Sequence, residues 1–327
     1  MKPWHSAALK YFAEGMSRKD IAKRIEVEFG LTNMYHAVAS YIYRQLKKAA
    51  LKDEPLRQLT YLPEEPKRVV IQNQEPEHYE GKWDGTQTLR FALMGDTQLG
   101  SKYTQLTHLH NFYGLCAELG IDTVYHTGDI TDGLKMRPGH EYELYEVSAD
   151  EMVEDVVQNY PKYEGITTHF ITGNHDASLY KHVGFDIGQA IATRRLDMKY
   201  LGRDCAIVNL TPNCTLELRH PWDGTAYAIS YKTQKMVEAM ESDSKPNILA
   251  VGHYHKAEYL FYRNVHVFQT GCFQGQTPFT RGKGISVHLG GWIVEIKVDK
   301  NGYIQGILPA FIPYYASIPE DYKNFVR

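Results

Sequence analysis

Five short apolar runs after residue 88 each end in a turn that carries carboxylate, amide or imidazole side chains. The turns read GDTQ after residues 91–94, TGDITD from 127, TGNHD from 172, RH at 219–220 and VGHYH from 251. A single turn of this kind is common in proteins. Five in series constrain the fold far more, because strands that end at one edge of a sheet deliver the following residues to a common crevice.

The spacing of the apolar runs predicts a layered α/β domain over residues 89–327. Strands are expected at 89–94, 122–127, 168–172, 215–219, 247–251, 265–270 and 292–298, and helices at 104–119, 141–160 and 186–199. Alternating strands and helices indicate sheets that are covered by helices. Asn301 and Gly302, which follow the last run, predict a tight hairpin.

Residues 1–50 have a different pattern, which predicts a small all-α domain of three helices. Ser17 is a typical N-cap, Ile21 and Ile25 recur on one helical face, and Gly30 is a typical C-cap. The short GLT turn between the second and third helices favours a helix-turn-helix. Residues 51–88 contain four prolines and predict a linker, with a short strand at 68–72.

Charge is distributed unevenly along the chain. Residues 1–60 hold eleven Lys/Arg and six Asp/Glu, a net of +5, whereas the remainder has a net of -8. A basic head of this kind favours binding of a polyanion. Four cysteines without a C-x-x-C pair are expected to be buried thiols in a reducing compartment. With no membrane-length apolar stretch and no export signal, the sequence predicts a cytoplasmic protein that does not bind a membrane.

The side chains in the five turns suit a centre for hard or borderline metal ions. Carboxylate, amide and imidazole ligands favour Mn, Fe or Zn over a thiolate site, and Mg is also compatible with the oxygen ligands. One carboxylate can bridge two such ions at a spacing of about 3.5–4 Å. Two divalent metal ions, with Mn²⁺ as the first choice, are therefore expected as cofactors.

The turns together resemble the motifs of the calcineurin-like metallophosphoesterases. That family has the pattern D-x-H, G-D-x-x-D, G-N-H-[DE], a lone His and G-H-x-H. The same order occurs here as Asp96-x-Gln98, 128-GDITD-132, 173-GNHD-176, His220 and 252-GHYH-255. The resemblance covers about residues 89–310 and implies a two-sheet sandwich flanked by helices. The stretch GDTQLGS is most similar to the double-strand-break repair exonuclease branch, whose first motif typically reads D-T-H-L-G.

The resemblance also implies a role for each motif residue. The first metal would be held by Asp96, Gln98, Asp129 and His255. The second would be held by Asp129, Asn174, His220 and His253, with Asp129 bridging. His175 would face the scissile phosphate and stabilise it or protonate the leaving oxygen. Asp132 and Asp176 complete the catalytic set by orienting histidines or loops.

Gln98 departs from the family pattern, which has histidine at this position. Its amide oxygen can bind a hard cation but is a weaker ligand than imidazole. We therefore expect the first metal to bind more weakly and to favour Mn over Zn. The alternative is a partly degenerate site.

Other histidines have simpler interpretations. His126 and His169 lie within predicted strands and are expected to pack in the core. His182 and His140 are the next candidates for the lone ligand position taken by His220. His140 and Arg137 belong to a loop after the second motif, which is expected to be solvated; contact with substrate is the alternative.

The head contains the candidate nucleic-acid contacts. Base-reading residues of a helix-turn-helix lie at the start of its recognition helix, and cations nearby bind phosphates. The candidates are Arg18, Lys19, Lys23, Arg24, Asn33, His36, Arg44, Lys47 and Lys48. A three-helix bundle used for dimerisation or partner binding is the alternative.

These features predict a dinuclear phosphodiesterase that uses a metal-activated water, with DNA as substrate and partner. The alternatives are a phosphomonoesterase or protein phosphatase, a hydrolase of small phosphodiesters, and a DNA-binding regulator with an inactive metal domain. The sequence leaves open whether the protein forms a homo-oligomer. An ATPase partner is known in the repair branch, but no docking segment for one is apparent in this sequence.

Overall fold

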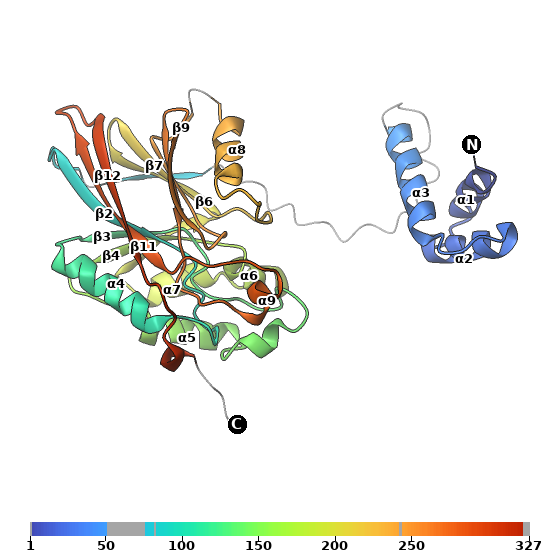
Figure 1. Ribbon diagram of the computed structural model, residues 1–327, viewed down its shortest axis with the longest axis horizontal. Helices are drawn as coiled ribbons and strands as arrows, with labels where there is room; N and C mark the ends of the chain where they lie inside the picture. The colour runs from blue at the N-terminus through green and yellow to red at the C-terminus, as the bar shows by residue number, and fades with distance from the viewer. Residues whose placement is uncertain (1, 51–75, 82, 242–243, 323–327) are drawn as a thin grey trace. The chain divides into compact units, whose positions relative to one another are not determined.

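A computed structural model describes residues 2–50, 76–81, 83–241 and 244–322 (Figure 1). The chain divides into two compact units, residues 1–73 and 74–327. The strand predicted at 68–72, and most of the predicted linker, lie outside the described residues. None of the helices in the described ranges is both long and apolar enough to cross a membrane.

The first unit contains the three predicted helices, α1 (Trp4–Ala13), α2 (Arg18–Phe29) and α3 (Tyr35–Ala50). Ser17 caps α2 by accepting a hydrogen bond from the amide of Asp20 at 3.2 Å, and Gly30 ends it in the left-handed conformation. One apolar face from each helix meets in a core that includes Trp4, Ile21 and Ile42. The three helices are therefore held together by apolar packing, and the caps fix where α2 begins and ends.

The second unit is built from two six-stranded mixed sheets, which confirms the predicted α/β sandwich. One sheet has the order β1 (Glu77–Glu80), β6 (Cys205–Thr211), β7 (Cys214–Arg219), β8 (Ile248–Val251), β10 (Val265–Thr270) and β9 (Ala257–Tyr262). The other has the order β12 (Ile304–Pro313), β11 (Gly290–Val298), β2 (Thr88–Met94), β3 (Thr123–His126), β4 (Thr167–Thr172) and β5 (Met198–Arg203). We call them the β6–β10 sheet and the β2–β5 sheet.

Alternation along β2 shows how the layers are assembled. Phe91 and Leu93 pack between the two sheets, whereas Ala92 and Met94 point to the helices on the other face. Burying each large side chain of this kind contributes about 1.5–3 kcal/mol. That second face is covered by helices α4 (Leu106–Glu118), α5 (Ala149–Asn159) and α7 (Ile187–Arg194).

The remaining helices complete the second unit. Val237 of α8 (Tyr231–Ala239) packs on the outer face of the β6–β10 sheet. Shorter elements are α6 (Asp176–Val183), α9 (Pro278–Gly282) and the 3-10 turns η2 (His140–Glu143) and η3 (Pro319–Asp321). All seven predicted strands are present, and the Asn-Gly hairpin joins β11 to β12.

Two predicted helices are shorter than expected. The helix predicted at 141–160 begins at 149, because the Ser148 side chain caps it by accepting from the amide of Glu151. The helix predicted at 186–199 ends at 194. The guanidinium of Arg195 binds the carbonyls of Tyr160 and Pro161, which directs the chain into β5. Within the predicted linker, β1 pairs with β6 and extends the β6–β10 sheet.

Candidate metal centre

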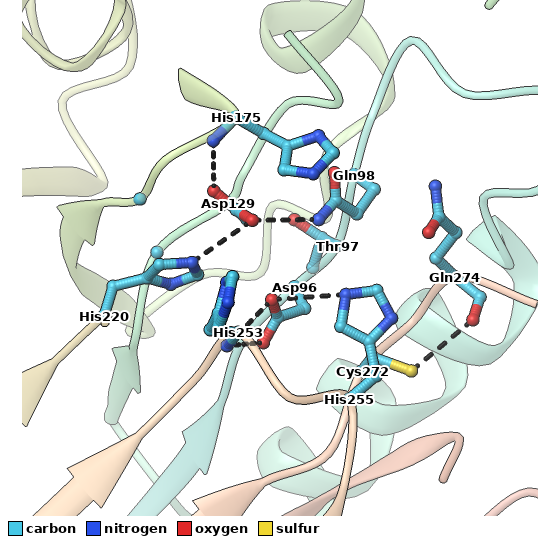
Figure 2. A network of polar contacts seen from close by, with 12 residues as sticks. Asp96, Thr97, Gln98, Asp129, His175, His220, His253, His255, Cys272 and Gln274 are labelled. Atoms are coloured by element: carbon cyan, nitrogen blue, oxygen red, sulfur yellow. Dashed lines mark hydrogen bonds and ion pairs between the residues drawn. The ribbon is translucent and has the colours of Figure 1, made fainter. Parts of the chain in front are cut away.

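The candidate ligands follow the carboxyl ends of five strands. Figure 2 labels all of them except Asn174. Strands β2, β3 and β4 are parallel neighbours in one sheet, and β7 and β8 are parallel neighbours in the other. Asp96, Gln98, Asp129 and Asn174 follow the first three strands, and His220, His253 and His255 follow the other two. The centre therefore lies where the ends of two sheets meet.

Backbone conformation at the centre is unusual. Of the ten non-glycine residues with positive φ that the structure describes, five are candidate ligands: Asp96, Gln98, Asp129, His253 and His255. The left-handed conformation costs an L-residue about 1–2 kcal/mol of conformational free energy. Local hydrogen bonds hold the backbone in this conformation. The amide of Asp96 donates to Gly128 O at 2.9 Å, and the amide of Gln98 donates to Asp129 O at 3.1 Å. Strain that persists under such restraint is typical of functional sites.

Glycine in the motifs is explained by close packing around the ligands. A Cβ on Gly173 would lie 2.3 Å from Asp129 Oδ1, and one on Gly128 would lie 2.7 Å from His220 Nδ1. Any side chain at these two positions would displace a candidate ligand.

One group of ligands surrounds Asp129. Its Oδ2 is 3.2 Å from His220 Nε2, and Asn174 Oδ1 lies 3.0 Å from that same nitrogen and 2.8 Å from His253 Nδ1. The far ring nitrogens are anchored: His220 Nδ1 donates to Thr127 O at 2.7 Å, and His253 Nε2 donates to Asp223 O at 2.6 Å. These bonds direct the second nitrogen of each ring toward the centre, as in protein metal sites.

A second group contains Asp96, Gln98 and His255. His255 Nε2 is 3.4 Å from Asp96 Oδ1, and the same carboxylate accepts the amide of His253 at 2.9 and 3.0 Å. Gln98 donates through Nε2 to Asp129 Oδ2 at 3.1 Å. Asp129 Oδ2 therefore contacts members of both groups, which is the position that a bridging ligand requires.

Gln98 Oε1 tests whether a cation fits here. It is buried and has no hydrogen-bond partner among the described residues. A buried unpaired oxygen costs about 1–3 kcal/mol, which a cation would recover. Together with the carboxylate and imidazole donors, it fits a divalent ion such as Mn²⁺ or Zn²⁺.

The charges of the ligands are tightly linked. Burial lowers the pKa of the His220 imidazole, but the Asp129 carboxylate outweighs burial and raises that pKa to about 9. Burial likewise raises the pKa of Asp129, but His220 and His175 reverse the effect and hold it below its usual range. Burial keeps the pKa of His253 low, at about 4. Metal binding requires neutral imidazole, so loading the centre would displace the proton of His220.

His175 lies beside the Asp129 group. Its amide donates to Asp129 Oδ1 at 2.9 Å, and its Nδ1 is 2.9 Å from Asp132 Oδ1. Burial lowers the pKa of His175, but the carboxylates of Asp129 and Asp132 raise it to about 9. Nε2 has no hydrogen-bond partner among the described residues, and the side chain is 19% exposed. The protonated ring can therefore present a donor to a phosphate ester.

Asp176 holds the loops of the centre together. Its carboxylate accepts hydrogen bonds from the amides of Ile130, Thr131 and Gly173 at 2.9–3.1 Å, and from the Thr131 hydroxyl at 2.8 Å. It thus ties the turn after β3 to the turn after β4. Its oxygens face these amides and the Thr131 hydroxyl rather than the candidate ligands.

Comparison with known proteins agrees with this geometry. The family profile described as calcineurin-like phosphoesterase matches residues 89–254, which is half of the chain. The chain belongs to the calcineurin-like phosphoesterase family. No curated protein sequence matches this phosphoesterase significantly.

Solved structures similar to this phosphoesterase have low sequence identity to it. An archaeal phosphodiesterase is 12% identical with a TM-score of 0.40, over 68% of this chain and all of its own. A "predicted phosphoesterase" from Streptococcus pneumoniae is 14% identical with a TM-score of 0.34, over 70% and 99% of the two chains. Wild-type Vps29 from Entamoeba histolytica, in complex with zinc, is 11% identical with a TM-score of 0.33, over 69% and 99%. The family assignment rests on the sequence match.

Three further side chains lie near the centre of the phosphoesterase, outside the motif residues. His140 was expected in a solvated loop, but it is completely buried and faces Asp132. Gln274 donates to Asp132 Oδ2 at 3.3 Å. Cys272 lies beside His255 (Figure 2). It follows β10 through Gly271, in the same strand–glycine pattern that precedes several candidate ligands, and its thiol is buried, as the sequence predicts.

The other predicted residues lie outside the centre. His126 is buried, with Nε2 3.2 Å from the Thr97 hydroxyl, as expected for a packing residue. His182 is exposed on α6. In the head, the exposed candidates are Arg18, Lys19, Lys23, Arg24, Asn33, His36 and Arg44. Asn33 precedes α3 rather than beginning it, because its φ of 57° lies outside the α-helical range. The side chains of Lys47 and Lys48 lie outside those described.

Replacing Gln98 by histidine is expected to strengthen binding of the more weakly held metal by about tenfold. Imidazole is the better ligand, and the change removes the unpaired amide oxygen. Titration of the metal-free protein with Mn²⁺ or Zn²⁺ would measure both affinities. Gln269→His, at another buried glutamine, is the matched control and should leave them unchanged. Equal affinities in Gln98→His and wild type would contradict the expectation that Gln98 makes the first metal bind more weakly.

Proposed function

We propose that this metal-dependent hydrolase cleaves phosphodiester bonds, with DNA as its substrate, at a dinuclear centre. The observation that carries the proposal is Asp129 Oδ2, which contacts both ligand groups while Asp129 Oδ1 binds the amide of His175. Metal ligands, a bridging carboxylate and a proton donor are thereby joined in one hydrogen-bonded unit.

The chain's own groups account for the steps of such a reaction. When bound, two divalent cations would neutralise phosphate charge and lower the pKa of a water. Asn174 and neutral imidazoles limit the negative charge near an anionic substrate. His175, held through Nδ1, presents Nε2 to the leaving oxygen and can donate its proton as that bond breaks. Asp132 keeps the ring in the required tautomer.

Two features support DNA as the substrate. One is the resemblance of GDTQLGS to the repair exonucleases. The other is the row of exposed cations on α2, namely Arg18, Lys19, Lys23 and Arg24. Cations grouped on one short helix suit contacts to successive phosphates. The proposed role of the head, residues 1–50, is to bring DNA to the phosphoesterase domain as a helix-turn-helix does.

Cleavage of end-labelled single- and double-stranded DNA with Mn²⁺, Mg²⁺ or no metal tests the proposal. We expect metal-dependent products that disappear in His175→Ala and persist in Glu217→Gln. Glu217 is a suitable control because it is buried on β7 and pairs with Arg219 rather than with the candidate ligands. Hydrolysis of aryl phosphate esters without DNA cleavage would refute DNA as the substrate but retain the phosphoesterase. DNA binding without hydrolysis of any ester would favour an inactive regulator.

Replacing the four cations of α2 by glutamine should weaken DNA binding and reduce its salt dependence. Each phosphate contact that is lost lowers the slope of log affinity against log salt by about 0.9. Fluorescence anisotropy at several salt concentrations would measure this slope. The control is Lys199→Gln with Lys297→Gln, at two strand lysines in the second unit. An unchanged slope in the α2 variant would argue against DNA binding by the head.

A further inference from the structure

His140 is a buried histidine with an unusual neighbour. It begins η2 and has no exposed surface, and its Nε2 is 3.4 Å from Asp132 Oδ2. The other oxygen of that carboxylate, Oδ1, is 2.9 Å from His175 Nδ1. Asp132 itself is 2% exposed. One buried carboxylate therefore lies between two imidazoles, only one of which belongs to the family motifs.

The ring of His140 is oriented by its other nitrogen. The amide of Met136 donates to His140 Nδ1 at 3.4 Å, so Nδ1 is an acceptor. In the neutral ring the proton is then on Nε2, which faces Asp132 Oδ2. Nε2 makes no hydrogen bond to a described residue, and Asp132 Oδ2, at 3.4 Å, is the acceptor that it faces. Within the described residues, Asp132 is therefore the acceptor available to this buried N–H.

We propose that His140 is a positioning residue, which fixes the Asp132 carboxylate and through it the imidazole of His175. The proposal rests on the function of His175 as a proton donor to the leaving oxygen. It does not require that the substrate be DNA.

The contacts of Asp132 explain why a second donor matters. A carboxylate fixed only through Oδ1 could turn about its Cβ–Cγ bond and change the direction of the His175 ring. Oδ2 has two polar neighbours, His140 Nε2 at 3.4 Å and Gln274 Nε2 at 3.3 Å. The Gln274 amide has two N–H groups and donates one to Asp132 and one to Ser101, at 2.9 Å. Gln274 and His140 therefore both face Oδ2, and His140 is the one of the two that is an imidazole with no other acceptor nearby among the described residues.

A metal ion is the competing explanation, because ligand atoms of Asp132, His140 and His175 lie within 4.8 Å of one another. Hydrogen bonding argues against it. His175 Nδ1 is also 2.7 Å from the carbonyl oxygen of Asp132, and a carbonyl at this distance requires an N–H on the ring. With a proton on Nδ1 of His175, that atom has no lone pair for a metal.

Two substitutions distinguish the effect of the His140 N–H from the effect of the volume of its ring. His140→Phe keeps a ring but removes the donor, whereas His140→Gln places an amide N–H near the position of Nε2. We would measure hydrolysis of aryl phosphodiesters whose leaving phenols have increasing pKa. A good leaving group needs little protonation, so its hydrolysis depends weakly on His175.

We expect His140→Phe to lower kcat about tenfold for the poorest leaving group, with little change for the best and no change in KM. His140→Gln should recover most of the loss. The same loss across the whole series in both variants would indicate a purely structural role and overturn the proposal. A loss of one bound metal ion per chain in His140→Phe would overturn it in favour of a metal site.

A readout independent of activity comes from the ring N–H protons in ¹⁵N-histidine NMR spectra. His140→Phe should shift the His175 Nδ1–H signal, and His140→Gln should shift it less. No shift in either variant would refute the coupling through Asp132. If the wild type hydrolyses none of the esters, the proposed function fails, and the NMR result alone decides whether His140 positions His175.

Discussion

Substitution of Asp129 by asparagine is expected to lower metal affinity by more than about 100-fold and to abolish hydrolysis. Side chains that only support a metal ligand are worth about 10–100-fold in metal affinity. Asp129 should be worth more, because its Oδ2 contacts the side chains of His220 and Gln98, one from each ligand group. Asparagine keeps the shape of the side chain but replaces one oxygen by an N–H₂. The new N–H₂ group would face His220 Nε2 or the amide of His175, so the network would lose a hydrogen-bond acceptor at its centre.

Metal content and thermal stability would measure the effect of Asp129→Asn. Wild type should retain bound Mn²⁺ after dialysis and gain thermal stability from it, because a ligand that binds only the folded state stabilises it. The variant should gain little. Glu217→Gln makes the same carboxylate-to-amide change at a buried site outside the ligand groups and should behave like wild type. A variant that still binds two ions would exclude Asp129 as a bridging ligand.

Replacing His175 by alanine should reduce kcat by about 10²- to 10⁴-fold while the metals remain bound. The ring is removed, but the backbone amide that donates to Asp129 Oδ1 is kept. The loss should be greatest for esters with poor leaving groups, since those need the proton most. Rates with a leaving-group series, together with metal content by elemental analysis, would separate catalysis from binding.

His266→Ala is the matched control for this experiment. His266 lies on β10 and contacts the Tyr259 hydroxyl, outside the ligand groups. It should leave both rate and metal content unchanged. If His175→Ala instead lost metal and activity together, His175 would be a ligand rather than a proton donor.

The strands that precede Asp96, Asp129 and Asn174 were largely predictable because they have a repeated local pattern. Each of the runs before Asp96, Asp129 and Asn174 is short, apolar and followed by a turn with glycine. The structure places those turns together through parallel pairing of β2, β3 and β4. Partly exposed strands mix polar and apolar residues and give a weaker signal, so β1, β5, β6, β9 and β12 were not predicted.

Residues without a local pattern could not be found from the sequence. The burial of His140 depends on how η2 folds onto the turn after β3, and nothing in its own sequence neighbourhood encodes that contact. Gln98 differs from His140, because its place in the turn after β2 was clear from the sequence. That its Oε1 is buried without a hydrogen bond among the described residues follows only from the structure. The family motif thus indicated the candidate ligands, whereas long-range packing determines their supporting partners.

The origin of the ligands in two sheets has a mechanical consequence. Asp96 and Asn174 extend from one sheet, and His220, His253 and His255 extend from the other. An ion held by both sets would act as a cross-link between the layers, joining positions as distant in sequence as 96 and 255. Such a link restricts the unfolded chain much as a disulfide that closes a long loop does. The loaded domain should therefore resist separation of its two sheets, and proteases should reach its inter-sheet core only after the ions have left.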